Sequence, residues 1–194
     1  MKIEYEATFP NVNKDDIRAK LKSAGAVLMR PEFLQRRIPF WLPGRVDAET
    51  SWVRVRDEGG SITMSIKTID GLGISDQREL CLSVNSFDDA VEFLKLLGCD
   101  PKSYQETKRE LWVLDGVEIT LDEWPFLEPF VEVEGNDESS VMLVSEKIGF
   151  KYDDALFCAV GKLYEMKYGV SSEDINVFEK LVFDMPNPFP ALMR

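Results

Sequence analysis

Over much of its length this chain alternates apolar with polar residues, and the polar positions are sorted by the sign of their charge. Successive side chains of a β-strand point to opposite faces, so the alternation predicts strands with one apolar and one polar face. Glu4 and Glu6 share such a face near the start of the chain, and Arg54 and Arg56 share one near its middle. Any fold must therefore accommodate strand faces that each carry like charges side by side.

The alternating segments predict about eight strands, and two glycine-containing pairs mark turns between them. Gly59-Gly60 and Asp115-Gly116 are typical of tight hairpins, which favours a mainly antiparallel sheet. The expected strands lie at residues 3–7, 33–40, 52–56, 61–68, 78–84, 107–114, 117–122 and 130–134.

Helical spacing of apolar residues predicts four helices, at residues 13–24, 86–97, 138–148 and about 153–168. Asn13 is a suitable N-cap and Gly25 a suitable residue just beyond the C-terminus of the first helix. We expect one domain over residues 1–169. The proline-containing residues 170–194 are expected to form a tail that packs on it.

Two folds are compatible with the charged strand faces. In one, an open sheet packs on helices through its apolar face and exposes the charged face to water. In the other, the strands close into a barrel, the charges point inward and helices cover the apolar outside. The paired like charges, the number of helices and the removal of free strand edges favour the second fold.

An inward-facing set of like charges is costly unless a ligand compensates it. Two carboxylates about 5 Å apart repel by roughly 3 kcal/mol at an effective dielectric constant near 20. A divalent cation relieves acidic pairs, whereas arginine and lysine are suited to an anion with several oxygens. A metal-bound polyphosphate satisfies both sets together, which explains the paired carboxylates at Glu4 and Glu6.

Composition restricts the other functions. The 194 residues carry a formal net charge of −12, which argues against binding to nucleic acid or to anionic membranes. The absence of histidine excludes histidine-based acid–base catalysis and common zinc sites. Three isolated cysteines, with no signal peptide and no apolar run near 18 residues, lead us to expect a cytoplasmic protein.

The order of the motifs resembles the CYTH superfamily of triphosphate tunnel metalloenzymes, which includes class IV adenylate cyclases and thiamine triphosphatases. The resemblance covers residues 1–165 and is greatest to the cyclase branch. It is carried by Glu4-Tyr-Glu6, Arg54-Val-Arg56, Ser65-Ile-Lys67-Thr, and residues 108–112, 115–122 and 130–135.

This resemblance implies an α+β fold, a closed eight-stranded antiparallel tunnel barrel with helices outside. It implies a Mg²⁺ or Mn²⁺ site made by Glu4, Glu6, Asp122, Glu132 and Glu134. It implies triphosphate binding by Arg54, Arg56, Lys67 and Arg109, with Arg36 or Arg37 as a further contact and Glu79 matching a family carboxylate. Lys108 is an alternative to Arg109, because alternation does not settle which of the two points inward. The expected catalytic residues are Glu4, Glu6, Lys67 and Arg109.

The implied activity is metal-dependent chemistry on a triphosphate such as ATP, tripolyphosphate or thiamine triphosphate, either cyclisation of ATP or hydrolysis. A homodimer is left open. One residue departs from the family pattern, since Thr8 stands where the family has a lysine on the first strand. That substitution supports an alternative, a non-catalytic module that binds polyphosphate or nucleotide.

Overall fold

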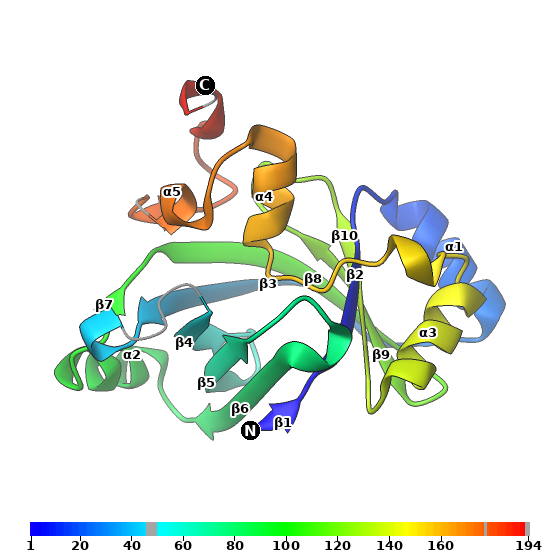
Figure 1. Cartoon of the computed structure of the whole chain (residues 1–194), viewed down its shortest axis with the longest axis horizontal. Coiled ribbons are helices and arrows are strands. Elements are labelled where there is room, and N and C mark those ends of the chain that lie inside the picture. The colour runs from blue at the N-terminus through cyan, green and yellow to red at the C-terminus, as the bar shows by residue number, and fades with distance from the viewer. Residues whose placement is uncertain (46–49, 177, 193–194) are drawn as a thin grey trace.

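The computed structural model describes residues 1–45, 50–176 and 178–192 (Figure 1). Its strands are mostly where the alternation predicts them, and several are longer. The strands are β1 (Lys2–Ile3), β2 (Tyr5–Phe9), β3 (Val27–Trp41), β4 (Ser51–Asp57), β5 (Ile62–Ile69), β6 (Gln77–Val84), β7 (Asp100–Pro101), β8 (Tyr104–Leu114), β9 (Val117–Glu123), β10 (Phe130–Gly135) and β11 (Lys180–Leu181).

The sheet closes on itself through the first strand. Neighbouring strands follow the order β1-β6-β5-β4-β3-β8-β9-β10-β2, so the two ends of the sheet are consecutive pieces of the same N-terminal segment. The break between them is at Glu4, whose backbone N–H donates to the Gln77 carbonyl at 2.9 Å. Counting β1 and β2 as one broken strand, the main path over the described residues is the expected eight-stranded antiparallel barrel.

Helices lie on the outside of this barrel, as Figure 1 shows. They are α1 (Lys14–Ala24), α2 (Phe87–Leu96), α3 (Glu138–Lys147), α4 (Gly161–Tyr168) and α5 (Ser172–Asn176). Asn13 caps α1 by accepting from the N–H groups of Asp15 and Asp16, and Gly25 follows the helix with φ of 85°. Short 3-10 turns lie at Pro43–Arg45, Ile74–Asp76, Tyr152–Asp154 and Phe189–Ala191.

The apolar core lies between the outer face of the barrel and these helices. Under α1 and α3 it includes Trp112, Ile119 and Val133, and under α2 it includes Val53 and Val55. The cover is incomplete on β6, where Leu80 and Leu82 remain 48% and 51% exposed, and on β3, where Leu28 and Leu34 remain 43% and 52% exposed. The expectation of an apolar exterior covered by helices therefore holds for much of the barrel but not for β6 and parts of β3.

The fourth predicted helix is wrong over its first half. Residues 155–160 are not helical, and Leu156 pairs with Thr8 through two backbone hydrogen bonds of 2.9 Å. This pairing supplies a partner for the edge of β2 beyond its break from β1. Because the Leu156 backbone is used there, α4 begins only at Gly161.

The C-terminal residues extend the fold beyond α4. β11 pairs in parallel with β8, and the fully buried Phe189 packs among Tyr164, Tyr168 and Phe178. Figure 1 shows this segment on the same side of the barrel as α4. β11 and Phe189 thus attach this segment to β8 and α4, while residues 177, 193 and 194 lie outside the described residues.

Candidate active site

A cavity of about 570 Å³ occupies the inside of the barrel. Its walls consist of the polar strand faces that the alternation predicted. On β4, for example, Val53 and Val55 pack outward against α2, so Arg54 and Arg56 must point inward. The predicted site residues that line the cavity are Glu4, Glu6, Arg37, Arg54, Arg56, Lys67, Glu79, Arg109, Glu132 and Glu134.

The lysine of the cavity lies between the two carboxylates of the N-terminal strand. Lys67 Nζ is 2.9 Å from Glu4 Oε2 and 3.5 Å from Glu6 Oε1. Burial alone would lower the pKa of Lys67, but Glu6 and Glu4 outweigh it and raise that pKa. Lys67 therefore stays protonated near neutral pH and acts as a fixed cation.

The arginine on β8 connects two further carboxylates. Arg109 Nε donates to Asp122 Oδ1 at 2.7 Å, and its Nη2 donates to Glu132 Oε2 at 2.6 Å. Asp122 is 1% exposed and does not itself line the cavity, but Arg109 connects it to the cavity. Thr120 Oγ1 also donates to Asp122, at 2.6 Å.

The surroundings of several of these carboxylates raise their pKa values. Burial, together with a hydrogen bond and repulsion from Glu79, raises the pKa of Glu4 to about 8. Burial raises the pKa of Glu6 to about 7, against the attraction of Lys67 and with repulsion from Glu132 and Glu134. Burial likewise raises the pKa of Asp122 to about 6 and raises that of Glu134. Burial is thus the main reason why these carboxylates are less readily ionised than in water.

On β4, each arginine pairs with one carboxylate. Arg54 Nη2 lies 2.9 Å from Glu79 Oε1, and Arg56 Nε lies 2.7 Å from Glu58 Oε1. Burial, followed by repulsion from Arg54 and Arg109, lowers the pKa of Arg56 to about 10. Like charges therefore also lie close together around β4, where they are positive.

Two predicted site residues do not reach the cavity. Arg36 pairs with Asp57 at 2.9 Å and is 47% exposed, while Lys108 pairs with Glu123 at 3.3 Å and lies over the Phe183 ring. Both are directed outward because their neighbours Arg37 and Arg109 occupy the inward positions of β3 and β8. The structure therefore settles the two register choices that alternation left open.

The cavity is also lined by residues that the sequence analysis did not predict there. β3 and β8 contribute Gln35, Gln105 and Thr107, all buried. Further lining residues are Cys158 and Tyr164, before and within α4, and Trp41, Trp52, Lys102 and Trp124. Uncharged residues cannot be sorted by the sign of their charge. Gln35, however, lies two residues from Arg37, and Gln105 and Thr107 lie four and two residues from Arg109, so the two-residue period of a strand would have placed all three inside.

Thr8 differs from the other residues of the first strand. It is 3% exposed, pairs with Leu156 through its backbone and is not among the residues that line the cavity. Its register partner on β10 is Glu132. The first strand thus contributes two carboxylates to the cavity, and no cation at position 8.

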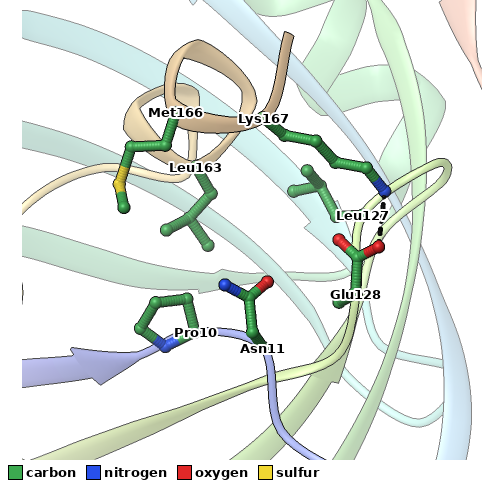
Figure 2. A pocket seen from close by; sticks show the side chains of 7 residues that line it. All are labelled: Pro10, Asn11, Leu127, Glu128, Leu163, Met166 and Lys167. Atoms are coloured by element: carbon green, nitrogen blue, oxygen red, sulfur yellow. Dashed lines mark hydrogen bonds and ion pairs between the residues drawn. The ribbon is translucent and has the colours of Figure 1, made fainter.

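A second pocket, of about 180 Å³, lies between the end of β2 and α4 (Figure 2). Leu127, Leu163 and Met166 form much of its lining, and its one charged pair joins Lys167 to Glu128 at 2.8 Å. This pocket lacks the opposed charged walls of the barrel cavity. We therefore place the candidate active site inside the barrel.

All five predicted metal ligands offer carboxylate oxygens, which suit a hard divalent cation. In the part of the chain that the structure describes, however, no three acidic or thiol side chains converge as a ready-made metal site. Lys67 and Arg109 hold four of the five carboxylates apart in two groups. Burial raises the pKa values of Glu4, Glu6 and Asp122, and a cation close to them would favour their ionised form.

A closed antiparallel barrel with an acidic and a basic inner wall defines a class of β-tunnel proteins that can hold a cation and a polyanion together. The chain belongs to the CYTH domain family, whose model matches residues 3–155. No curated protein matches the sequence. Among the described residues, no helix is long and apolar enough to cross a membrane.

Three solved structures share this fold, and this chain aligns with nearly the whole length of each. A conserved hypothetical protein from Pyrococcus furiosus is 20% identical with a TM-score of 0.70, covering 82% of this chain and 99% of its own. A candidate adenylate cyclase from Vibrio parahaemolyticus is 14% identical with a TM-score of 0.72, covering 84% and 98%. A Hippeastrum protein with a dominant triphosphatase activity is 13% identical with a TM-score of 0.60, covering 87% and 96%.

Proposed function

We propose that this protein is a metal-dependent enzyme that acts on a triphosphate-containing small molecule inside the barrel. The observation that carries the proposal is the interior itself, where carboxylates with raised pKa values and crowded guanidinium groups share one cavity. Membership of the CYTH family supports the same substrate class.

The ion pairs inside the cavity explain how ligands would enter it. Lys67 and Arg109 neutralise carboxylates in the free protein, and Glu79 and Glu58 neutralise Arg54 and Arg56. A cation on the carboxylates would release the lysine and arginine, which could then bind phosphate oxygens. Each ligand therefore creates a binding site for the other, and we expect the metal and the triphosphate to bind cooperatively.

Glu4, Glu6, Glu132 and Glu134, whose carboxylates line the cavity, would hold Mg²⁺ or Mn²⁺, and Asp122 would join them once Arg109 releases it. When bound, the metal neutralises charge on the phosphate oxygens. Arg54, Arg56, Lys67 and Arg109 would hold the remaining oxygens, with arginine providing planar forks and lysine a point charge. Fixed donors of this kind stabilise the charge that develops at phosphorus without reorganising.

Cyclisation and hydrolysis both fit this cavity. In hydrolysis, water attacks the terminal phosphorus; in cyclisation, the ribose 3′-oxygen of ATP attacks the α-phosphorus and pyrophosphate leaves. The Vibrio and Hippeastrum structures support one reaction each, through a candidate cyclase and a triphosphatase. We therefore leave the choice of reaction to experiment.

The test is a panel of ATP, tripolyphosphate and thiamine triphosphate, each with Mg²⁺, with Mn²⁺ and with a chelator. Release of phosphate, pyrophosphate or cyclic AMP that requires a metal is the expected result. The matched pair of variants is Arg54→Gln, in the cavity, and Arg36→Gln, outside it. Product formation without added metal, or equal activity in the two variants, would contradict the proposal.

A second candidate function is a non-catalytic module that binds polyphosphate or nucleotide. It is favoured by Thr8, which is buried against Leu156 and supplies no cation to the cavity. Tight calorimetric binding of tripolyphosphate without turnover of any substrate in the panel would select it. A gain of turnover in Thr8→Lys would then identify the residue responsible.

A further inference from the structure

The inner face of β4 continues beyond its two arginines to a carboxylate. Glu58 follows Arg56 by two residues, so it has the same inward parity as Arg54 and Arg56. Of the described residues, Arg56 lines the cavity and Glu58 does not. Glu58 therefore lies at the rim of the cavity, where β4 turns into β5 through residues 58–61.

The contact between Arg56 and Glu58 is close but poorly aligned. Arg56 Nε lies 2.7 Å from Glu58 Oε1, and the two side chains are 16% and 21% exposed. Arg56 Nε nevertheless has no hydrogen bond among the described residues, so its N–H does not point along this contact. Arg54 differs, because its Nη2 donates to Glu79 Oε1 at 2.9 Å. An acceptor in line with the Arg56 N–H would thus be preferred over Glu58.

The turn itself holds Glu58 beside Arg56. The Glu58 N–H donates to the Ser61 carbonyl at 2.9 Å, and Ser61 Oγ donates to Glu58 Oε2 at 3.3 Å. One carboxylate oxygen therefore faces Arg56 while the other is held by the turn. Gly59 completes the turn with φ of 74°, a conformation that other residues rarely adopt.

A residue of β3 also holds the turn. Arg30 Nη2 donates to the Glu58 carbonyl, and the Arg30 guanidinium lies over the Phe33 ring, 3.3 Å from its centroid. The last pair of β3 with β4 is Arg36 with Asp57, so the turn lies beyond that pairing. Backbone pairing therefore does not fix the turn against the first part of β3, and the Arg30 side chain supplies a link.

Glu58 supplies from within the chain the negative charge that a bound anion would supply. Burial, followed by repulsion from Arg54 and Arg109, lowers the pKa of Arg56 to about 10, and Glu58 acts against this shift. An anion that uses Arg56 must first break the pair with Glu58. The free energy of that pair is subtracted from the binding of the anion, because the binding-competent Arg56 is only a fraction of the free protein.

We propose that Glu58 is an internal competitor of the substrate, which holds Arg56 toward the rim in the free protein, and that Arg30 is a positioning residue that keeps Glu58 there. The inference rests on the proposed function and specifies how the affinity of that same site is limited. Its consequence is that substrate and product bind less tightly than the cavity would allow, because each must displace the same carboxylate.

The test is a double-mutant cycle, in which tripolyphosphate in Mg²⁺ is titrated calorimetrically into the full chain. The variants are Arg56→Gln, Glu58→Gln and the two combined. We expect Glu58→Gln to tighten binding by about five- to tenfold, because the pair no longer has to be broken. In the Arg56→Gln background the same change should alter binding by less than about twofold, because no pair exists there.

The matched control is Asp57→Asn, which removes the same charge from the neighbouring residue of the hairpin. Asp57 pairs with Arg36 outside the barrel, so this control should change binding by less than about twofold. Arg30→Met retains Glu58 but removes its link to β3. It should tighten binding by about two- to threefold, and only while Glu58 is present.

Three outcomes would overturn the competitor while leaving the proposed function intact. They are an unchanged or weaker affinity in Glu58→Gln, an equal gain in Asp57→Asn, and an equal gain in the Arg56→Gln background. Binding by Glu58→Gln but not by the wild type would support the competitor. If neither protein binds tripolyphosphate with Mg²⁺ or Mn²⁺, the proposed function fails and the competitor with it. Should Glu58→Gln not fold, Arg30→Met with and without Arg56→Gln carries the test.

Discussion

The molecule contains two clusters of charged side chains, one partly buried outside the barrel wall and one inside the barrel. The outer cluster comprises Lys14, Arg18, Glu32, Glu110 and Glu123, at the contact of α1 with the sheet. Within it, Arg18 Nη2 lies 2.8 Å from Glu110 Oε2, and Trp112 Nε1 donates to Glu110 Oε1 at 2.7 Å. The inner cluster comprises the carboxylates and cations of the cavity.

The pKa values of Glu110 and Glu123 in the outer cluster are lowered, whereas the carboxylates of the inner cluster are divided. Burial alone would raise the pKa of Glu110, but hydrogen bonds from Arg18 and Trp112 outweigh it and lower that pKa. Inside the barrel, burial prevails at Glu4, Glu6 and Asp122 and raises their pKa values, whereas at Glu132 the attraction of Arg109 outweighs burial and lowers the pKa. The fold itself satisfies the outer charges, whereas it leaves several of the inner carboxylates unsatisfied. This difference indicates that the outer cluster serves stability and the inner cluster serves a ligand.

The most direct test of the division between the two clusters is to neutralise a carboxylate of the inner cluster. We expect Glu6→Gln to reduce metal-dependent turnover by about 100-fold or more, because a metal ligand is lost. The free energy of unfolding of the metal-free protein should rise by about 1 kcal/mol, because the cost of burying the Glu6 carboxylate is removed, together with its repulsion from Glu132 and Glu134. Initial rates and denaturant titrations measure the two effects. A clear loss of stability would show that Glu6 belongs with the outer cluster.

The next effect concerns the inner cations. Arg54→Gln should weaken tripolyphosphate binding by about 10- to 100-fold with or without metal, because a charged donor to the anion is removed. Calorimetry in Mg²⁺ and in chelator gives the two values. An effect confined to the metal-containing titration would assign Arg54 to metal binding through Glu79 rather than to the phosphate.

In the outer cluster the consequences should be reversed. Glu110→Gln removes the charge-assisted hydrogen bonds from Arg18 and should lower the free energy of unfolding by about 2 kcal/mol. That corresponds to a fall in Tm of about 4–8 °C for a chain of this size. Tripolyphosphate affinity should stay within about twofold of the wild type. A selective loss of affinity at unchanged stability would contradict the division between the clusters.

The outer cluster also predicts a dependence on pH. The pKa of Glu110 is lowered in the folded protein, so its contribution is complete above the unfolded value of about 4.3 and is lost as pH falls through the folded value. The stability difference between wild type and Glu110→Gln should therefore shrink as pH is lowered from 5 toward 3. Denaturant unfolding at several pH values measures it, and a difference that grows on acidification would refute the assignment.

The smallest effect is expected for Arg36, which joins neither cluster. Its pair with Asp57 is largely exposed, and exposed pairs contribute about 0–1 kcal/mol. Arg36→Gln should change the free energy of unfolding by less than about 0.5 kcal/mol and leave ligand binding unchanged. A larger effect on binding would mean that the side chain reaches the cavity.

Alternation predicted the inner faces well where the two neighbours of a charged residue were apolar. Val53 and Val55 flank Arg54, and Val131 and Val133 flank Glu132, so packing on the outside leaves one choice for the charged side chain. Alternation does not decide which side chain points inward where two cations are adjacent, as at Arg36 and Arg37. There the outward residue was selected by a partner, Asp57, on the next strand.

Long-range pairing also decided what local helical pattern could not. The apolar residues near 155–160 resemble the start of a helix, but Leu156 forms backbone hydrogen bonds with Thr8, far away in the sequence. Gln35 and Gln105 carry no charge, so only their parity with Arg37 and Arg109 indicates that they face the cavity. Which residues lie opposite them depends on the register of β3 against β8.

The amino-acid sequence by itself determined the strands, their inner and outer faces and the separation of acidic from basic residues, because a strand repeats every two residues. The tertiary structure alone decided which charges meet, which remain uncompensated and where the barrel closes. These depend on strand register and on the break at Glu4, which are properties of pairing between distant segments and leave no periodic trace in the chain.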